Sequence, residues 1–241
     1  MLTNLTNIER ITSRTQSILR SSSKKTYAII DGDRTLIPTD STRHFFRSLD
    51  LDFRNIKTIF ETHEYSFQAF LEAAKFYSAL EPDQYEAGCI SSANAVNIYP
   101  EFLNFLNQVK YNVELVVITS GIKRSWELLL QKHSLHDVHL IAGTCLELDN
   151  YVVDKAGKGI VAQTLLSAGK EVFAFGDSLV DLDMLTEAHH PHLIVNEKQN
   201  RDIIPFISNI TNLQQISFSA FEHSEIPTTS LTKVADKIFS L

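Results

Sequence analysis

Two aspartates separated by one residue follow a short apolar run near the start of the chain. Residues 27–36 read YAIIDGDRTL, and the apolar part is too short and too β-branched for a helix. We therefore expect a buried strand that ends at Asp31 and Asp33. Carboxylates spaced in this way can divide labour: one attacks phosphorus or holds a metal, while the other moves a proton. Taken alone, Asp-Gly-Asp is equally consistent with a polar turn.

Further polar side chains occur where other strands are expected to end or helices to begin. In chain order they are Ser120, Lys158, Asp177 and Asp181. In an open parallel sheet the ligand crevice lies at the carboxyl ends of the strands, so these side chains are expected to meet Asp31 and Asp33 there.

The elements that must position these residues alternate between strand and helix. Apolar runs predict strands at residues 27–30, 113–118, 139–142, 172–175 and 193–195. Helical patterns occupy residues 101–110, 126–133, 158–168 and 182–188. Such alternation predicts an α/β fold with a doubly wound, Rossmann-like parallel sheet.

A helical segment interrupts this alternation after the first strand. Ten of the 22 Phe and Tyr residues lie between Phe45 and Tyr85. Phe67, Phe70 and Ala74 belong to a helical stripe. We expect residues 40–96 to form a small helical cap with its own core, inserted into a catalytic core of residues 26–39 and 97–204.

Two flanking segments complete the expected organisation. Residues 1–25 form an amphipathic helical arm that is expected to pack on the core, although their Arg- and Ser-rich composition also fits an organellar transit peptide. Residues 205–241 form a C-terminal extension, and the helical stripe Leu231, Val234, Ile238 and Leu241 is expected to pack back on the core.

Composition narrows the functional classes. Acidic residues outnumber basic ones by 29 to 22, which argues against a general nucleic-acid binder. Cys89 and Cys145 lie far apart in sequence, so neither a disulfide framework nor a thiolate metal cluster is indicated. No apolar run approaches the roughly 20 residues of a membrane span. We expect a soluble, cytoplasmic protein without membrane or nucleic-acid partners, and no feature indicates its oligomeric state.

Four motifs in order, over about residues 27–200, resemble the haloacid dehalogenase superfamily and, more narrowly, its phosphoserine-phosphatase-like branch. They are IIDGDRTL, VVITSGIKRS, GKGIVAQTLL and FAFGDSLVDLDML. The resemblance implies that Asp31 is the nucleophile that forms an aspartyl-phosphate. It also implies that Asp33 is the general acid and base, a residue that a dehalogenase of the family would lack.

The same resemblance assigns the remaining catalytic groups. Ser120 and Gly121 would bind the phosphoryl group. Lys158 would neutralise the charge of that group and of Asp31, and Lys155 is a weaker candidate for this role.

A Mg²⁺ ion is the implied cofactor. Its ligands would be the carboxylates of Asp31 and Asp177 and the backbone carbonyl of Asp33, since a hard cation prefers oxygen. Asp181 would orient the metal waters or Lys158, and Arg124 would be either structural or phosphate-facing.

The implied activity is hydrolysis of a phosphomonoester, with a small phosphorylated metabolite as the partner. Two alternatives stay open: a phosphotransferase that uses an acceptor other than water, and a phosphate-recognising protein on the same fold without catalysis.

Departures from the family pattern affect the substrate. Arg34 replaces a Ser, Ile122 replaces a Gly, and Asp40 replaces the Glu that meets the substrate amine in phosphoserine phosphatases. Ala74, followed by Lys75, stands at the cap position of their carboxylate-binding Arg. We therefore expect that free L-phosphoserine is not the preferred substrate.

Three histidines near the fifth expected strand invite comparison with a zinc site. His189, His190 and His192 flank Pro191, but their spacing fits no standard zinc motif. We expect a solvated loop there.

Overall fold

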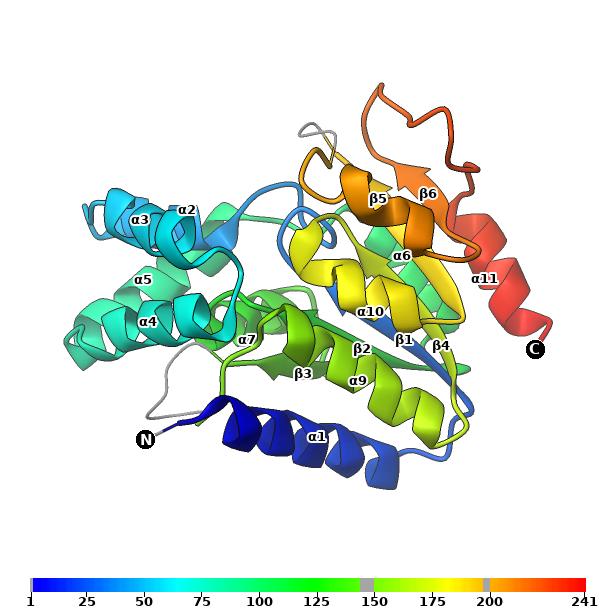
Figure 1. Ribbon diagram of the computed structural model, residues 1–241, viewed down its shortest axis with the longest axis horizontal. Coiled ribbons are helices and arrows are strands. Elements are labelled where there is room, and N and C mark those ends of the chain that lie inside the picture. The colour runs from blue at the N-terminus through cyan, green and yellow to red at the C-terminus, as the bar shows by residue number, and fades with distance from the viewer. Residues whose placement is uncertain (1, 144–149, 197–199) are drawn as a thin grey trace.

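A computed structural model describes residues 2–143, 150–196 and 200–241 and contains a six-stranded, all-parallel sheet (Figure 1). The strand order is β3-β2-β1-β4-β5-β6, which places β1 in the middle. The strands are β1 (Thr26–Asp31), β2 (Val113–Thr119), β3 (His139–Ala142), β4 (Glu171–Gly176), β5 (His190–Val195) and β6 (Gln214–Ser217). The expected α/β, doubly wound fold is confirmed.

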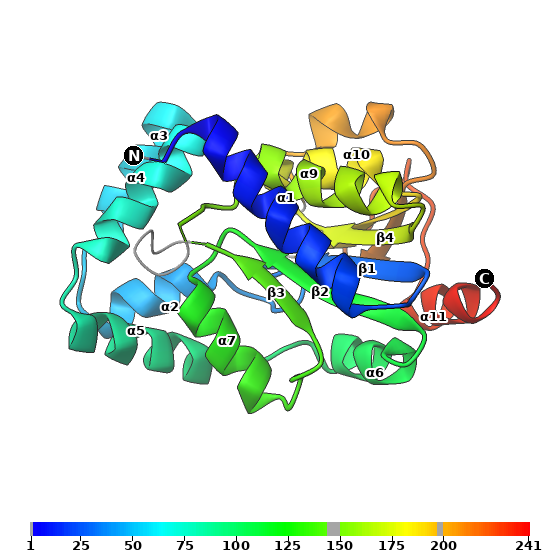
Figure 2. The same ribbon diagram turned by 90° about the horizontal axis from the view of Figure 1, so that it is seen from below.

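Helices cover both faces of the sheet (Figure 2). One face carries α1 (Asn4–Ser21), α9 (Lys155–Ser167) and α10 (Leu182–Glu187). The other carries α6 (Pro100–Val109), α7 (Lys123–Lys132) and α11 (Leu231–Phe239). Along β1, Tyr27 and Ile29 belong to the first core while Ala28 and Ile30 belong to the second, as the two-residue period of a strand requires.

Helices α2–α5 cluster at one end of the sheet and are here called the insert (residues 41–95) (Figures 1 and 2). They are α2 (Ser41–Ser48), α3 (Arg54–His63), α4 (Phe67–Ser78) and α5 (Pro82–Ala95). The insert has a core of its own, in which the rings of Phe45 and Tyr77 meet edge to face at 5.8 Å. Ile122, which lies outside the insert in the sequence, is also buried in this core.

The N-terminal helix is an integral layer of the fold. Ile11 and Ile18 are buried against α9 and the sheet. The side chain of Asn7 donates to the carbonyl of Val152 (3.0 Å) and accepts from its N–H (2.8 Å). Helix α1 thereby supports the segment that leads into α9.

A sixth strand, β6, was not expected from the sequence. It pairs with β5 at the edge of the sheet and forms part of the C-terminal segment. Its sequence, QQIS, has one aliphatic residue, and the buried Gln215 amide donates to the carbonyls of His223 and Ile226, both at 2.8 Å. A strand whose buried position is filled by a hydrogen-bonded amide shows no apolar run, so periodicity misses it.

The expectation of a solvated loop at the three histidines is wrong. His190 and His192 lie in β5, and His192 is only 2% exposed. Its ring stacks on Phe175 with centroids 4.8 Å apart. Burial lowers the pKa of His192 to about 3, which keeps the imidazole neutral.

Two further features concern the whole described chain. None of its helices is both long and apolar enough to cross a membrane. Cys89 is buried in the insert, whereas Cys145 lies outside the described residues.

The buried His192 predicts a pH-dependent stability. Because the folded state resists protonation and the unfolded histidine titrates near pH 6.5, the unfolded chain gains a proton as the pH falls below that value. Between pH 7 and pH 5 the wild type should lose about 2 kcal/mol more unfolding free energy than His192→Phe. Urea unfolding of both proteins at the two pH values measures this difference, and equal losses would contradict it.

Candidate functional site

The first strand ends in a tight turn that carries both aspartates of the opening motif. Three N–H groups, from residues 35–37, donate to the carbonyl of Gly32 at 2.8–3.3 Å. A Cβ on Gly32 would lie 2.4 Å from the ring of Trp126, so a larger residue does not fit there. Asp31 and Asp33 consequently stand at the carboxyl edge of the central strand, where the sequence placed them.

Lys158 lies at the centre of the site. Its side chain is 2% exposed, and its ammonium donates to Oδ1 of Asp31 and to Oδ1 of Asp181, the latter at 2.7 Å. Asp154 caps the N-terminus of α9, and its carboxylate accepts the N–H of Gly157 at 2.8 Å. Burial alone would lower the pKa of Lys158, but the carboxylates of Asp181 and Asp31 raise it above its ordinary value. The ammonium group is therefore charged.

Lys155, the competing candidate, lies on the outer side of the same helix. It pairs with Asp183 at 3.2 Å, and both side chains are at least one-third exposed. Of the two lysines, the structure therefore brings only Lys158 to Asp31.

Asp181 holds Lys158 and the loop after β4 together. Its Oδ2 accepts from the N–H of Asp177 (3.1 Å) and from the N–H and hydroxyl of Ser178 (both 3.0 Å). A Cβ on Gly176 would lie 2.5 Å from the Asp181 side chain, so glycine is needed for this close approach. Because both of its carboxylate oxygens accept hydrogen bonds, Asp181 holds Lys158, Asp177 and Ser178 in position.

Three residues that the sequence did not single out hold Asp177. Thr35 and Asn196 donate to its carboxylate at 3.4 and 3.0 Å, and Asn200 donates to its carbonyl at 2.6 Å. Asn196 directly follows β5, so it stands at the same carboxyl edge as the aspartates. That position is the only signal that sequence reasoning could have used.

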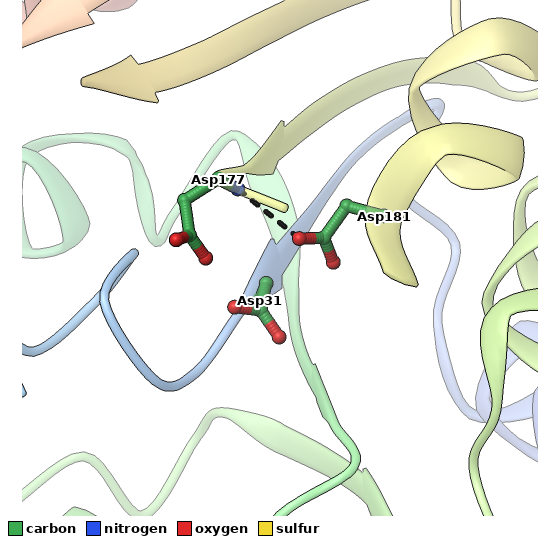
Figure 3. Close-up of side chains that lie close together, drawn as sticks. All are labelled: Asp31, Asp177 and Asp181. Carbon is green, nitrogen blue, oxygen red and sulfur yellow. Dashed lines mark hydrogen bonds between the residues drawn. The ribbon is translucent and has the colours of Figure 1, made fainter. Parts of the chain in front are cut away.

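The buried carboxylates suit a hard cation. Asp31, Asp177 and Asp181 each offer an oxygen, and these atoms lie within 4.8 Å of one another (Figure 3). Burial, and then the charges of Asp181 and Asp31, raise the pKa of Asp177 well above its usual range. Burial and Asp181 likewise raise the pKa of Asp31 to about 6, against the lowering effect of Lys158. A divalent cation would offset this excess of negative charge.

Asp33 faces the insert. Its Oδ1 accepts the N–H of Ser41, the first residue of α2, at 2.9 Å. Burial, followed by the nearby charge of Asp40, raises the pKa of Asp33 to about 7. A carboxyl group with such a pKa can both donate and accept a proton near neutral pH. Asp40 itself is bonded to Arg34 at 2.8 Å.

The loop after β2 presents one unpaired hydroxyl. The Oγ of Ser120 is buried and has no hydrogen-bond partner among the described residues. The N–H of Gly121, which was expected to bind phosphate, donates to Oγ1 of Thr119 at 3.0 Å. Because Ser120 lines the same cavity as Asp31, its hydroxyl is a candidate donor to an anion bound there.

Arg124 does not face the site. Its guanidinium forms a fork with Glu86, with contacts from 2.7 to 3.1 Å, and so joins α7 to α5 of the insert. Neither residue of this pair lines the cavity that contains the carboxylates, and the pairing supports the structural alternative for Arg124.

One cavity of about 740 Å³ connects the carboxylates to the insert. Its floor includes Asp31, Asp33, Ser120, Lys158 and Asp177. Its far walls come from α2, α3 and α4. The catalytic candidates therefore share one cavity with a large chamber lined by the insert.

Comparing the two lysines tests the importance of the buried charge. Lys158→Met leaves Asp31 and Asp181 buried without their cation, and should lower the unfolding free energy by about 3 kcal/mol. Lys155→Met removes an ion pair at the surface and should cost less than about 1 kcal/mol. Urea unfolding at pH 7 in EDTA compares the variants with wild type; similar losses would show that Lys158 is not the essential cation.

Solved structures of known proteins share this fold at low sequence identity. A phosphoserine phosphatase with a phospho-aspartyl intermediate analogue has a TM-score of 0.58 at 12% identity, covering 89% of this chain and 99% of that chain. A substrate-bound phosphoserine phosphatase has a TM-score of 0.55 at 14% identity, covering 79% and 100%. A HAD family hydrolase from Salmonella enterica serovar Typhi has a TM-score of 0.56 at 16% identity, covering 80% and 74%.

Sequence comparison gives the family. A search of curated proteins found no match. The family model for haloacid dehalogenase-like hydrolases matches residues 28–186, a span that contains Asp31, Lys158, Asp177 and Asp181. This chain belongs to the haloacid dehalogenase-like hydrolase family.

Proposed function

We propose that the protein is a phosphatase that hydrolyses a small-molecule phosphomonoester through an aspartyl-phosphate on Asp31. The observation that carries the proposal is the bond from buried Lys158 to Asp31 at the floor of the cavity. Lys158 bonds one oxygen of Asp31, and the second oxygen is the candidate for attack on phosphorus. The second aspartate, Asp33, lines the same cavity and supports proton transfer.

The chain's own residues account for both halves of the reaction. In the first, Asp31 attacks phosphorus, the bond from phosphorus to the alcohol oxygen breaks, and Asp33 gives that oxygen its proton. In the second, Asp33 takes a proton from water, the water oxygen attacks phosphorus, and the bond to Asp31 breaks to release phosphate. Positioned proton transfer of this kind typically contributes about 10²–10⁴-fold. The Ser120 hydroxyl would donate to a phosphoryl oxygen, and Lys158 would balance its charge.

Mg²⁺ fits the oxygen-only donor set. Asp31 and Asp177 would hold it, with the Asp33 carbonyl as the third protein ligand that the family resemblance implies. Bound there, the cation would reduce repulsion between the anionic nucleophile and the anionic phosphate.

Replacing the nucleophile tests the proposed function. Asp31→Asn should lower the rate on p-nitrophenyl phosphate with Mg²⁺ by a factor on the order of 10³ or more, because the amide cannot form the acyl-phosphate. Asp183→Asn, which alters a partly exposed acid paired with Lys155, is the control and should stay near wild type. EDTA should abolish the wild-type rate. Activity that survives either the Asp31 substitution or EDTA would overturn the proposal.

L-phosphoserine is expected to be a poor substrate. Ala74 is fully buried beside Phe70, Val152 and Val180 and offers no cation to a carboxylate. Asp40 is bonded to Arg34 and is therefore not free to meet an ammonium group. The ammonium group of phosphoserine therefore lacks a charge-assisted bond, a loss that typically costs one to two decades in specificity. The kcat/KM for L-phosphoserine should accordingly lie at least about tenfold below the best of a panel of sugar, nucleotide and cofactor phosphates. If phosphoserine leads that panel by a decade, the expectation is wrong.

A further inference from the structure

The cavity extends well beyond the space that a phosphoryl group and a short alcohol occupy. A volume of about 740 Å³ lies within the range of pockets that enclose ligands of drug size. Beyond the carboxylates its walls include Phe53, Ile56, Phe60, Phe70 and Tyr77. The chamber that would receive the leaving group is therefore large and aromatic.

The walls are held in place by packing. Ile56, Phe70 and Tyr77 are 3–6% exposed, so most of each side chain is fixed inside the insert. Phe60 lies edge to face with Phe70, with centroids 5.0 Å apart. Phe53 meets Phe46 edge to face at 5.4 Å. Such a wall needs little rearrangement to receive a flat apolar group.

The charges of the chamber favour a leaving group that is not cationic. Apart from the catalytic groups, the charged residues that line it are Arg34, Arg43, Lys57, Arg201, Asp40 and Asp202. Asp40 is bonded to Arg34, and Asp202 accepts the N–H of Leu179 at 3.1 Å. Arg43 also pairs with Asp40, and Lys57 pairs with Glu61 outside the chamber. Both acids of the chamber therefore already have donors, so an added ammonium group would find no carboxylate without a donor among them.

We propose that the natural substrate is the phosphate ester of an alcohol that bears an aromatic or heteroaromatic ring. The ring packs against Phe53, Phe60 and Phe70 while the phosphoryl group lies at Asp31 and Ser120. This inference rests on the proposed phosphatase function and adds the class of leaving group. Burying a ring in such a chamber should raise kcat/KM by about 10- to 100-fold over a small alkyl ester.

Paired substrates with similar reacting alcohols provide the test. One pair is 2-phenylethyl phosphate and ethyl phosphate; the other is adenosine 5′-monophosphate and ribose 5-phosphate. In at least one pair the ring-bearing member should have a kcat/KM at least tenfold higher. Ratios near one in both pairs, with activity present, would overturn the inference and leave the proposed function standing. No activity on any of these phosphates or on p-nitrophenyl phosphate would overturn both.

Two matched variants locate the preference. Phe60→Ala removes a wall of the chamber, whereas Phe76→Ala removes a ring of the same insert that stacks on Phe46 and does not line the cavity. The ratio of ring to alkyl kcat/KM should fall about fivefold or more in Phe60→Ala and stay unchanged in Phe76→Ala. Because both substrates are measured on the same preparation, a partial loss of folded protein cancels. An unchanged ratio in Phe60→Ala, or equal losses in both variants, would overturn the proposed ring site.

Discussion

A buried ammonium group between two carboxylates is the interaction on which the site depends. Burying one cation and several acids is costly unless each charge is paired and hydrogen-bonded, and Lys158 meets this requirement through Asp31 and Asp181. Its position depends on where α9 begins, and that start is set by the Asp154 cap. Asp181 depends in turn on Gly176, which leaves room for its side chain. The geometry around the proposed nucleophile, Asp31, thus depends on elements far apart in the sequence.

The fold separates the proposed chemistry from the proposed selectivity. The carboxyl edge of the sheet supplies the reacting groups, and the insert supplies the aromatic chamber. The two parts meet at specific contacts: the Asp33 carboxylate with the N–H of Ser41, and the fork between Arg124 and Glu86. Ile122, which departs from the family motif, is buried in the core of the insert. Its packing there accounts for an aliphatic residue at this position. This departure from the family pattern therefore lies where core and insert join.

Much of the arrangement could be predicted because strand ends in a parallel sheet share one edge. Asp31, Ser120 and Asp177 each follow a strongly apolar strand, so their meeting required only the fold class. The later chain was harder to interpret. Strand β6 contains the buried Gln215, and β5 contains the buried His192. Because polar residues are usually exposed, the sequence did not indicate that these two positions are buried. A buried polar residue is identified by its neighbours, which sequence periodicity does not report.

The sequence by itself determined the order of the elements as far as β5, the parallel α/β class and the residue types that could carry out phosphoryl chemistry. Local periodicity and the ends of strands are visible in short stretches of chain. Only the tertiary structure decided which lysine meets Asp31, that Arg124 pairs with Glu86, that Asn196 and Asn200 hold Asp177, and that the chamber is aromatic. Each of these depends on contacts between distant segments, and such contacts are set by packing and charge compensation in three dimensions.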